Sequence, residues 1–325
     1  MNFVGDIKTA KVGNIILNDV DNNKIADGNN GFEFSTQLVD HNRNPVKQAG
    51  LVIKWRQEKG TIVSLPASSE TDSDGRAPIT LKSSKKAVDN VVIYAQYGTS
   101  GEEKSEAVNF IANINTAKIK AVTLDDKVID KVADGINDFT FIAQLVDQFD
   151  SPIKVVELDI SWLLADDKAE DAHLSAASSQ TDKNGLATIK LISTNKAVDN
   201  IVVSAQYGTA PKIDATTSVN FIADVATTRV GSVTLVDDIV RKVADGKNHF
   251  TFKAKLVDKH ENLVKVLNLE VNWQQDTNGN YIILPASSKT NSDGQAMIEL
   301  QSTNTAVNNI TVSARYNTSE KKDAE

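Results

Sequence analysis

The sequence predicts an all-β protein made of three tandem β-sandwich domains in an elongated array. Landmark motifs recur about every 110 residues, apolar and polar residues alternate inside each repeat, and turn-forming residues separate the alternating segments. A repeat of this length is a whole small domain, because solenoid units are only about 20–50 residues long. We therefore expect three separate domains, called copies 1, 2 and 3.

The spacing of the landmarks defines the repeat. The tripeptide Ala-Asp-Gly starts at Ala26, Ala133 and Ala244, in steps of 107 and 111 residues. The same two steps separate the Leu-Val-Asp motifs and the only three tryptophans, which are Leu38, Leu145, Leu256, Trp55, Trp162 and Trp273. Later landmarks keep steps of 110 and 109 residues and are Gly75, Gly185, Gly294, Tyr97, Tyr207 and Tyr316. The differences in length therefore lie in a loop between the tryptophan and the glycine.

Each copy is predicted to hold about seven strands in two sheets. Phe32, Phe34 and Leu38 alternate with polar residues, and Ile160 and Trp162 do the same in copy 2. A period of two places one face of each strand in the core, where the tryptophans are large core fillers.

The turns have a chemical basis. An Asp-Gly or Asn-Gly pair lies between two strand patterns in each copy, and its glycine supplies the positive φ of a tight turn. These glycines are Gly75, Gly185 and Gly294. The Asp of each Ala-Asp-Gly is expected to accept hydrogen bonds from backbone amides in the turn before the Phe-rich strand.

Composition narrows the functional classes. The chain has 35 Lys and Arg against 43 Asp and Glu, a net charge of −8, which disfavours nucleic-acid binding. It has no cysteine, which excludes disulfides, thiolate metal sites and cysteine nucleophiles. No stretch approaches the roughly 18 apolar residues of a membrane span, and the first residues lack the pattern of a signal peptide.

The junction sequences predict the domain boundaries. Residues 2–7, 109–114 and 220–225 share the pattern Asn-Phe, an aliphatic residue, a small residue, Asp or Asn, and a second aliphatic residue. We expect residues 1–6 to be the stub of a preceding repeat, and copies 1, 2 and 3 to span 7–114, 115–225 and 226–325. Copy 3 lacks the last Val-Asn-Phe strand, from which we expect a chain cut from a longer array, with a natural terminal domain that lacks one strand as the alternative. We expect an exposed sheet edge there, either blunted or paired with a neighbour such as the N-terminal segment of another molecule.

Several strings resemble the group 1 bacterial immunoglobulin-like domain. They are residues 133–141, 143–147 and 177–188 of copy 2, with Asn44-Pro45-Val46 of copy 1. The resemblance covers the whole chain and implies three tandem immunoglobulin-like β-sandwich domains of an intimin- or invasin-type adhesin, an inverse autotransporter. It implies a location on the bacterial surface, with an anchor in the outer membrane supplied by a region outside this chain. It also implies a tip domain outside this chain that binds a host-cell or other surface protein. The short polar linkers between the copies separately predict an elongated, monomeric rod.

No constellation typical of catalysis is found. The histidines His41, His173, His249 and His260 do not recur in all copies and have no partner at metal-ligand spacing. No nucleophile motif or phosphate-binding glycine loop is present, so we expect no enzyme activity, no metal site and no cofactor.

Two acidic pairs leave one metal alternative open. Asp125-Asp126 and Asp237-Asp238 lie at a similar place in copies 2 and 3, where carboxylates near a junction could share a calcium ion. Solvated turn acids are the favoured alternative. In copy 1, residues 19–23 begin like a calcium loop, but Lys24 stands where that loop requires glycine.

Few aromatic residues are left for a binding surface. Tyr94, Phe149 and Tyr281 do not recur as aromatics in the other copies. Phe149 and Tyr281 are the candidate partner contacts, although packing under a long loop is the favoured alternative for both.

Three functions follow from these patterns. The first is a stalk that spaces or presents an adhesive tip, since the modules repeat without a distinctive site. The second is direct binding of a host protein by one of these modules, through the loops of different length that follow each tryptophan. The third, an enzyme or its sugar-binding accessory module, has no supporting acid pair or nucleophile. Phage tail decoration is a further non-enzymatic alternative.

Overall fold

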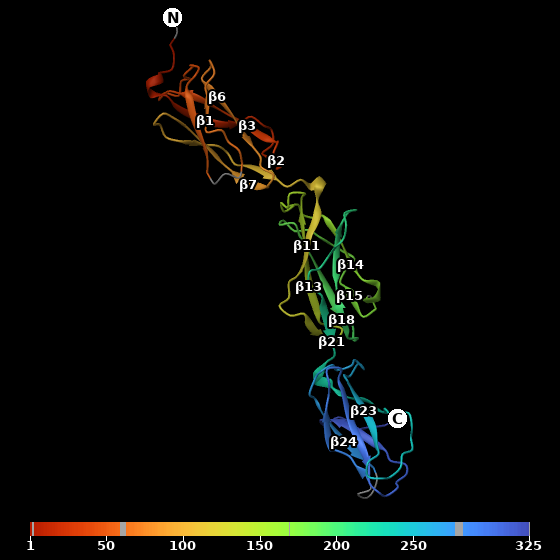
Figure 1. Cartoon of the computed structure of the whole chain (residues 1–325). Helices are drawn as coiled ribbons and strands as arrows, with labels where there is room; N and C mark the ends of the chain where they lie inside the picture. The colour runs from red at the N-terminus through yellow and green to blue at the C-terminus, as the bar shows by residue number, and fades with distance from the viewer. Residues whose placement is uncertain (2, 59–62, 169, 277–281, 325) are drawn as a thin grey trace.

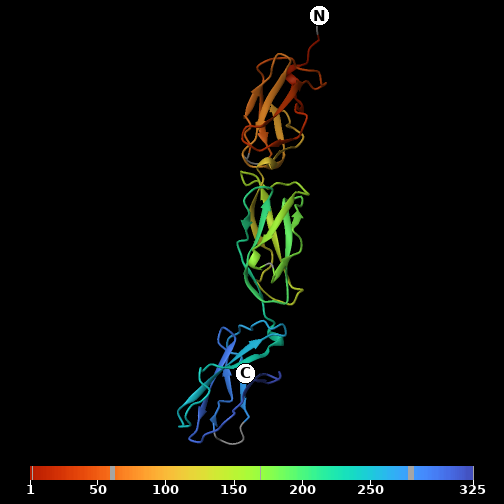
Figure 2. The same cartoon turned by 90° about the vertical axis from the view of Figure 1, so that its right-hand side faces the viewer.

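The computed structural model describes residues 1, 3–58, 63–168, 170–276 and 282–324. Three domains follow one another end to end, with the N-terminus at one end of the array and copy 3 at the other (Figures 1 and 2). The described helices are 3-10 turns, η1 (Ile7–Thr9), η2 (Ile114–Thr116), η3 (Asp166–Lys168) and η4 (Val225–Thr227). None of the described residues forms a helix long and apolar enough to cross a membrane. The predicted all-β array is confirmed.

Copy 2 is a β-sandwich with a small third sheet. Its two large sheets have the strand orders β11-β13-β17-β15 and β16-β14-β19-β20, and the small sheet has the order β12-β21-β18. The strands are β11 (Lys118–Leu124), β12 (Asp130–Val132), β13 (Asp138–Val146), β14 (Asp159–Leu164), β15 (Ala172–Leu174), β16 (Ser178–Gln180), β17 (Leu186–Ser193), β18 (Val198–Ile201), β19 (Val203–Tyr207), β20 (Ile213–Asp214) and β21 (Val219–Ile222). Inward side chains from all three sheets share one apolar core.

Copy 1 repeats this arrangement. Its sheets have the orders β1-β3-β6, β5-β4-β8-β9 and β2-β10-β7. The strands are β1 (Lys11–Leu17), β2 (Asn23–Ile25), β3 (Gly31–Val39), β4 (Val52–Gln57), β5 (Ser68–Glu70), β6 (Arg76–Lys82), β7 (Val88–Val91), β8 (Ile93–Tyr97), β9 (Glu103–Lys104) and β10 (Val108–Ile111).

Copy 3 has the two large sheets but, among its described residues, no small one. The orders are β22-β23-β27-β25 and β26-β24-β28-β29. The strands are β22 (Arg229–Leu235), β23 (His249–Val257), β24 (Glu270–Gln275), β25 (Ile282–Ile283), β26 (Ser287–Lys289), β27 (Gln295–Ser302), β28 (Val312–Tyr316) and β29 (Lys322–Asp323).

The tryptophans fill the cores as predicted. Trp162 is only 5% exposed, and its indole N–H donates to Ser179 Oγ at 2.8 Å, which satisfies the one polar atom of a buried indole. Trp55 and Trp273 make the same bond to Ser69 and Ser288, each at 2.9 Å. One pair of side chains therefore fixes the tryptophan strand to its neighbour in every copy.

The two turn predictions are also confirmed. Gly185 has a φ of 75°, and its equivalents in the other copies have positive φ as well. Asp134 Oδ1 accepts hydrogen bonds from the amides of Ile136 and Asn137 at 2.9 and 2.8 Å. Asp27 and Asp245 do the same in copies 1 and 3.

The last strand of copies 1 and 2 lies in the centre of the small sheet. β21 pairs parallel with β12 and antiparallel with β18, and β10 is placed likewise in copy 1. In copy 3 the equivalents of β12 and β18, residues 241–243 and 307–310, do not form strands. The expectation that this strand is a sheet edge is therefore corrected, because β10 and β21 lie in the centre of the small sheet in copies 1 and 2.

Candidate functional site

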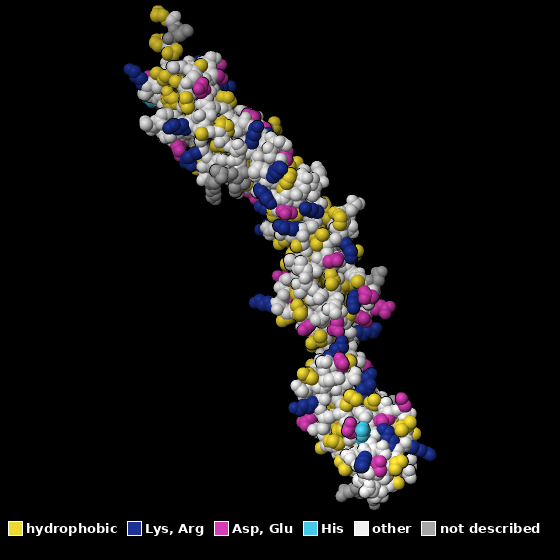
Figure 3. Space-filling view, viewed as in Figure 1, with side chains coloured by type: hydrophobic (Ala, Val, Ile, Leu, Met, Phe, Trp, Pro, Cys, Tyr) yellow, Lys and Arg dark blue, Asp and Glu magenta, His cyan; other side chains and the backbone are white. Residues whose placement is uncertain are grey.

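Polar contacts recur at both junctions between copies. Among the described residues, the junctions included, no group of three or more His, Cys, Asp or Glu side chains is placed to hold a metal ion. Lys, Arg, Asp and Glu side chains intermix over the face seen in Figure 3, without a large area of one sign. The junctions are therefore the candidate functional site.

Each linker is a capped 3-10 turn. The Asn113 side chain accepts a hydrogen bond from the Asn115 amide, and Asp224 does the same for Ala226, which stabilises the starts of η2 and η4. Asp6 caps η1 in the same way ahead of copy 1. The chain thus enters every copy through the same short turn and not through a flexible tract.

A buried aspartate ties each linker to the copy that follows it. Asp147 is fully buried, and its Oδ2 accepts from the linker amide of Asn113 at 3.2 Å. Its Oδ1 accepts from the amides of Phe149 and Ser151 at 2.8 and 2.9 Å. Asp258 repeats the linker bond with the Asp224 amide at 3.0 Å. The Asp of Leu-Val-Asp therefore fixes the direction in which each domain leaves its linker.

The loop held by this aspartate contacts the preceding copy. The Ala87 amide of copy 1 donates to Ser151 Oγ of copy 2 at 3.0 Å. At the next junction the Ala197 amide donates to Asn262 Oδ1 at 2.7 Å, and Asn262 Nδ2 donates to the Asn195 carbonyl at 2.8 Å. Backbone of one copy is thus hydrogen-bonded to a side chain of the next.

An ion pair lies beside each of these bonds. Lys154 of copy 2 binds Asp89 of copy 1 at 2.5 Å, and Lys265 of copy 3 binds Asp199 of copy 2 at 2.7 Å. The lysine side chains are 55% and 56% exposed, so each pair contributes only about 0–1 kcal/mol. We call the ion pair together with the neighbouring Ala amide bond the junction clasp. The clasp gives little stabilisation, but it joins the two copies at a point outside the linker.

The structure places Phe149 at the first junction. Its ring is half-buried, with Lys85 Nζ of copy 1 at 5.4 Å from the ring centroid, and the Lys86 ammonium donates to its carbonyl. Lys85 and Lys86 therefore hold an interdomain contact. At the second junction His260 stands in its place. Contact of Phe149 with an external partner stays a prediction, and Tyr281 lies outside the described residues.

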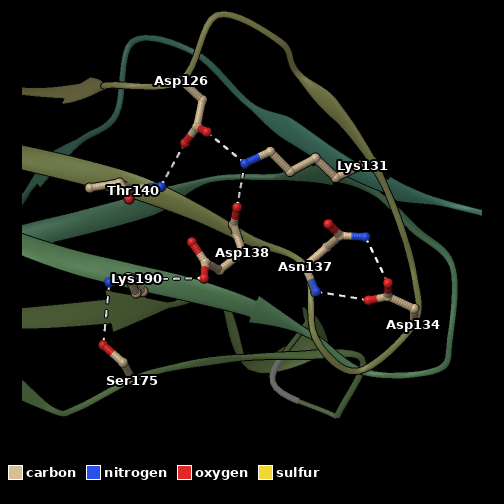
Figure 4. Close-up of polar contacts among 8 residues, drawn as sticks. All are labelled: Asp126, Lys131, Asp134, Asn137, Asp138, Thr140, Ser175 and Lys190. Atoms are coloured by element: carbon tan, nitrogen blue, oxygen red, sulfur yellow. Dashed lines mark hydrogen bonds and ion pairs between the residues drawn. The ribbon is translucent and has the colours of Figure 1, made fainter.

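The acidic pairs are engaged by lysine. Asp126 binds the Lys131 ammonium at 2.5 Å and accepts from the Thr140 amide at 2.8 Å (Figure 4). Lys131 also donates to the Asp138 carbonyl and lies over the Phe139 ring at 4.6 Å. The equivalent pairs are Asp19 with Lys24 and Asp237 with Lys242. In all three copies a lysine ammonium therefore pairs with the equivalent aspartate.

These environments keep the carboxylates ionised. Burial raises the pKa of Asp258, but hydrogen bonds from Asn262 and the Asp224 amide outweigh it and hold the pKa below its ordinary value. Burial also opposes the lowered pKa of Asp126, where Lys131 and the Thr140 amide prevail. Because both pKa values are lowered, their stabilisation is complete above the unfolded pKa, about 3.9, and is lost as pH falls through the folded values.

Sequence reasoning missed the clasp residues. Lys154 and Lys265 are 111 residues apart and Asp89 and Asp199 are 110 apart, so both sets keep the repeat spacing. The sequence did contain a signal for the clasp, because these charged residues recur in loops whose composition otherwise varies.

Comparisons with known proteins agree with this architecture. The chain matches the bacterial Ig-like domain (group 1) over residues 14–111, 121–222 and 232–325. It is 26% identical over 293 residues to the inverse autotransporter adhesin YeeJ of Escherichia coli strain K12, across 89% of this chain and 12% of YeeJ. It is 30% identical over 167 residues to intimin of Escherichia coli O127:H6, strain E2348/69 (EPEC), across 50% of this chain and 16% of intimin. The chain therefore spans a small part of each relative.

One solved structure supports the fold of the array. Yersinia pseudotuberculosis InvD superposes on the chain with a TM-score of 0.52 at 10% identity, over 98% of each chain. At this identity the likeness concerns the fold alone.

Proposed function

Because the chain belongs to the bacterial Ig-like domain (group 1) family, we propose that it is a stalk segment of an intimin/invasin-type surface adhesin. The observation that carries this proposal is the junction clasp, which recurs with the same residue roles at both junctions. A spacer needs domains that add length in a fixed direction, and the clasp with its capped linker supplies that direction. Stalk function needs no pocket and no catalytic group.

The proposal includes a location and a partner class. The stalk stands on the bacterial cell surface, held in the outer membrane by a region outside these residues. It presents an adhesive region, also outside them, to a host-cell or other surface protein, and it catalyses no reaction. Support comes from YeeJ and intimin, of which the matched residues cover only 12% and 16%.

Small-angle X-ray scattering of the dilute chain tests the spacer role. We expect the profile of a rod, since three domains lie end to end (Figure 1). Deleting residues 115–225 joins Ile114 to Ala226, the equivalent of Asn115, and leaves Asp89 facing Lys265 across a compatible clasp. That variant should remain a rod, shorter by about one third, because each copy adds one equal length. A compact particle, or a deletion that leaves the maximum dimension unchanged, would exclude a stalk.

A further inference from the structure

The entering and leaving segments of the chain lie side by side in copy 2 and run in the same direction. β12, which follows β11, pairs parallel with β21, the last strand of the copy. The Asn220 amide donates to the Ile129 carbonyl at 2.7 Å before this pairing, and its side chain donates to Asp130 at 2.6 Å. After the pairing, the Ala133 amide donates to the Ile222 carbonyl at 2.8 Å. The two segments are thus bonded along the whole length of β12.

Copy 1 repeats this arrangement. β2 pairs parallel with β10, and the Asn109 amide donates to the Asn22 carbonyl at 2.8 Å. The Asn109 side chain donates to Asn23 Oδ1, and the Ala26 amide donates to the Ile111 carbonyl, each at 2.8 Å. The parallel pair is therefore a feature of the module and not of one copy.

The direction of these strands decides how tension would act on them. Figure 1 shows the chain entering copy 2 at the end next to copy 1 and leaving it, after β21, at the end next to copy 3. Pulling these two ends apart drags β12 and β21 in opposite directions along their lengths. Because the strands are parallel, all bonds between them then bear the load together, and none can break alone.

A lysine closes the turn between β11 and β12. Lys131 of β12 binds Asp126 at 2.5 Å and also donates to the Asp138 carbonyl at the start of β13 (Figure 4). Asp126 in turn accepts from the Thr140 amide of β13 at 2.8 Å. Residues 126–131 are therefore fastened to the large sheet, and β12 cannot be drawn out before Lys131 leaves these oxygens. We call the contacts of Lys131 with Asp126 and the Asp138 carbonyl the lysine lock.

The lysine lock recurs in every copy. Lys24 pairs with Asp19 and Lys242 with Asp237, and each ammonium also donates to a backbone carbonyl at the start of the Phe-rich strand. The side chains of Lys24, Lys131 and Lys242 are only 26%, 21% and 18% exposed. Water screens these bonds less than it screens an ion pair on the open surface, so the lysine lock is stronger than such a pair.

We propose that copies 1 and 2 are built to bear tension along the array, with the parallel strands as the load-bearing pair and the lysine lock as its fastening. The source of the tension rests on the proposed stalk role, since a stalk held at one end and bound to a partner at the other is pulled along its length. Resistance to tension depends on the rate of unfolding, so the lysine lock acts even where it adds little equilibrium stability.

Single-molecule force spectroscopy of the 325-residue chain tests the load-bearing pair by changing the direction of pull. The chain has no cysteine, so handles on Asn115→Cys and Ala226→Cys, both exposed, pull copy 2 along the array. Handles on Ile136→Cys, which is 80% exposed, and Ala226→Cys pull at one end of copy 2 and open its strand pairs one bond at a time. We expect copy 2 to unfold at a several-fold lower force in the second direction. Equal forces in both directions would overturn the proposal.

Lys131→Met tests the lysine lock, because it removes the ammonium and keeps an apolar side chain of similar length. At constant force along the array, it should speed the unfolding of copy 2 by about tenfold or more, the loss expected for hydrogen bonds to a charged group. Lys190→Met is the matched control. It breaks the 57% exposed ion pair of Lys190 with Asp138, which joins β17 to β13 away from the entering and leaving segments. It should change the rate by a few-fold at most.

Equal acceleration by the two variants would contradict the lysine lock. The force measurements and the scattering measurement also fail separately. A rod whose copy 2 unfolds at the same force in both directions keeps the stalk role and removes the load-bearing pair. A compact particle in scattering removes the stalk role, while unequal forces would still support the load-bearing pair.

Discussion

Replacing Gly185 with alanine is expected to destabilise copy 2 by about 2–5 kcal/mol. Its φ of 75° disfavours any residue with a Cβ, and a Cβ there would lie 2.2 Å from the Ile153 carbonyl oxygen. That carbonyl belongs to the loop held by Asp147, so the clash has no flexible side chain to move aside. The turn and the junction loop are therefore coupled through one glycine.

Gly208→Ala is the matched control for this effect. Gly208 also has a positive φ, 53°, but a Cβ there meets nothing within 4 Å. Gly208→Ala should therefore lower the free energy of unfolding only by the cost of a Cβ at positive φ, about 1–2 kcal/mol. Urea unfolding followed by pulsed hydrogen exchange and mass spectrometry reports copy 2 separately from its neighbours. Equal losses of stability for the two variants would refute the steric argument.

Replacing Phe221 with alanine is expected to cost about 3–5 kcal/mol, the usual loss for a fully buried Phe. Phe221 belongs to the central strand of the small sheet, and its ring centroid lies 5.2 Å from that of Phe139 in β13. Ile222→Ala on the same strand is the control, because Ile222 is 37% exposed and should cost about 1 kcal/mol or less.

The same exchange measurement gives the second readout. In Phe221→Ala, amides of β12 and β18 should exchange faster than in the unmodified chain. Undiminished protection of β12 and β18 would mean that the central strand does not hold the small sheet together.

What the sequence predicts correctly is mostly local or repeated. The Asp134 turn depends on residues two and three positions away, and the Trp162 strand shows its buried face through a period of two. Neither needs knowledge of distant contacts.

Longer-range features were harder to predict. Lys154 and Asp89 are 65 residues apart and belong to different copies, so no local pattern joins them. The parallel pairing of β12 with β21 joins the two ends of one domain, which made the last strand look like an edge. Of the candidate contact residues, Phe149 lies at a junction because Lys85 and Lys86 of the preceding copy reach it, and sequence spacing alone does not show that.

The central claim is that each junction holds its two copies at one angle. Pulsed electron resonance between two spin labels at equivalent exposed positions tests this claim. Ser73→Cys with Lys183→Cys reports on the first junction, and Lys183→Cys with Ser292→Cys reports on the second. The chain has no cysteine of its own, so labelling is unambiguous. We predict one narrow distance distribution per junction, broadened at the first only by Lys154→Ala and at the second only by Lys265→Ala. Broad distributions in the chain with intact clasps would contradict the account.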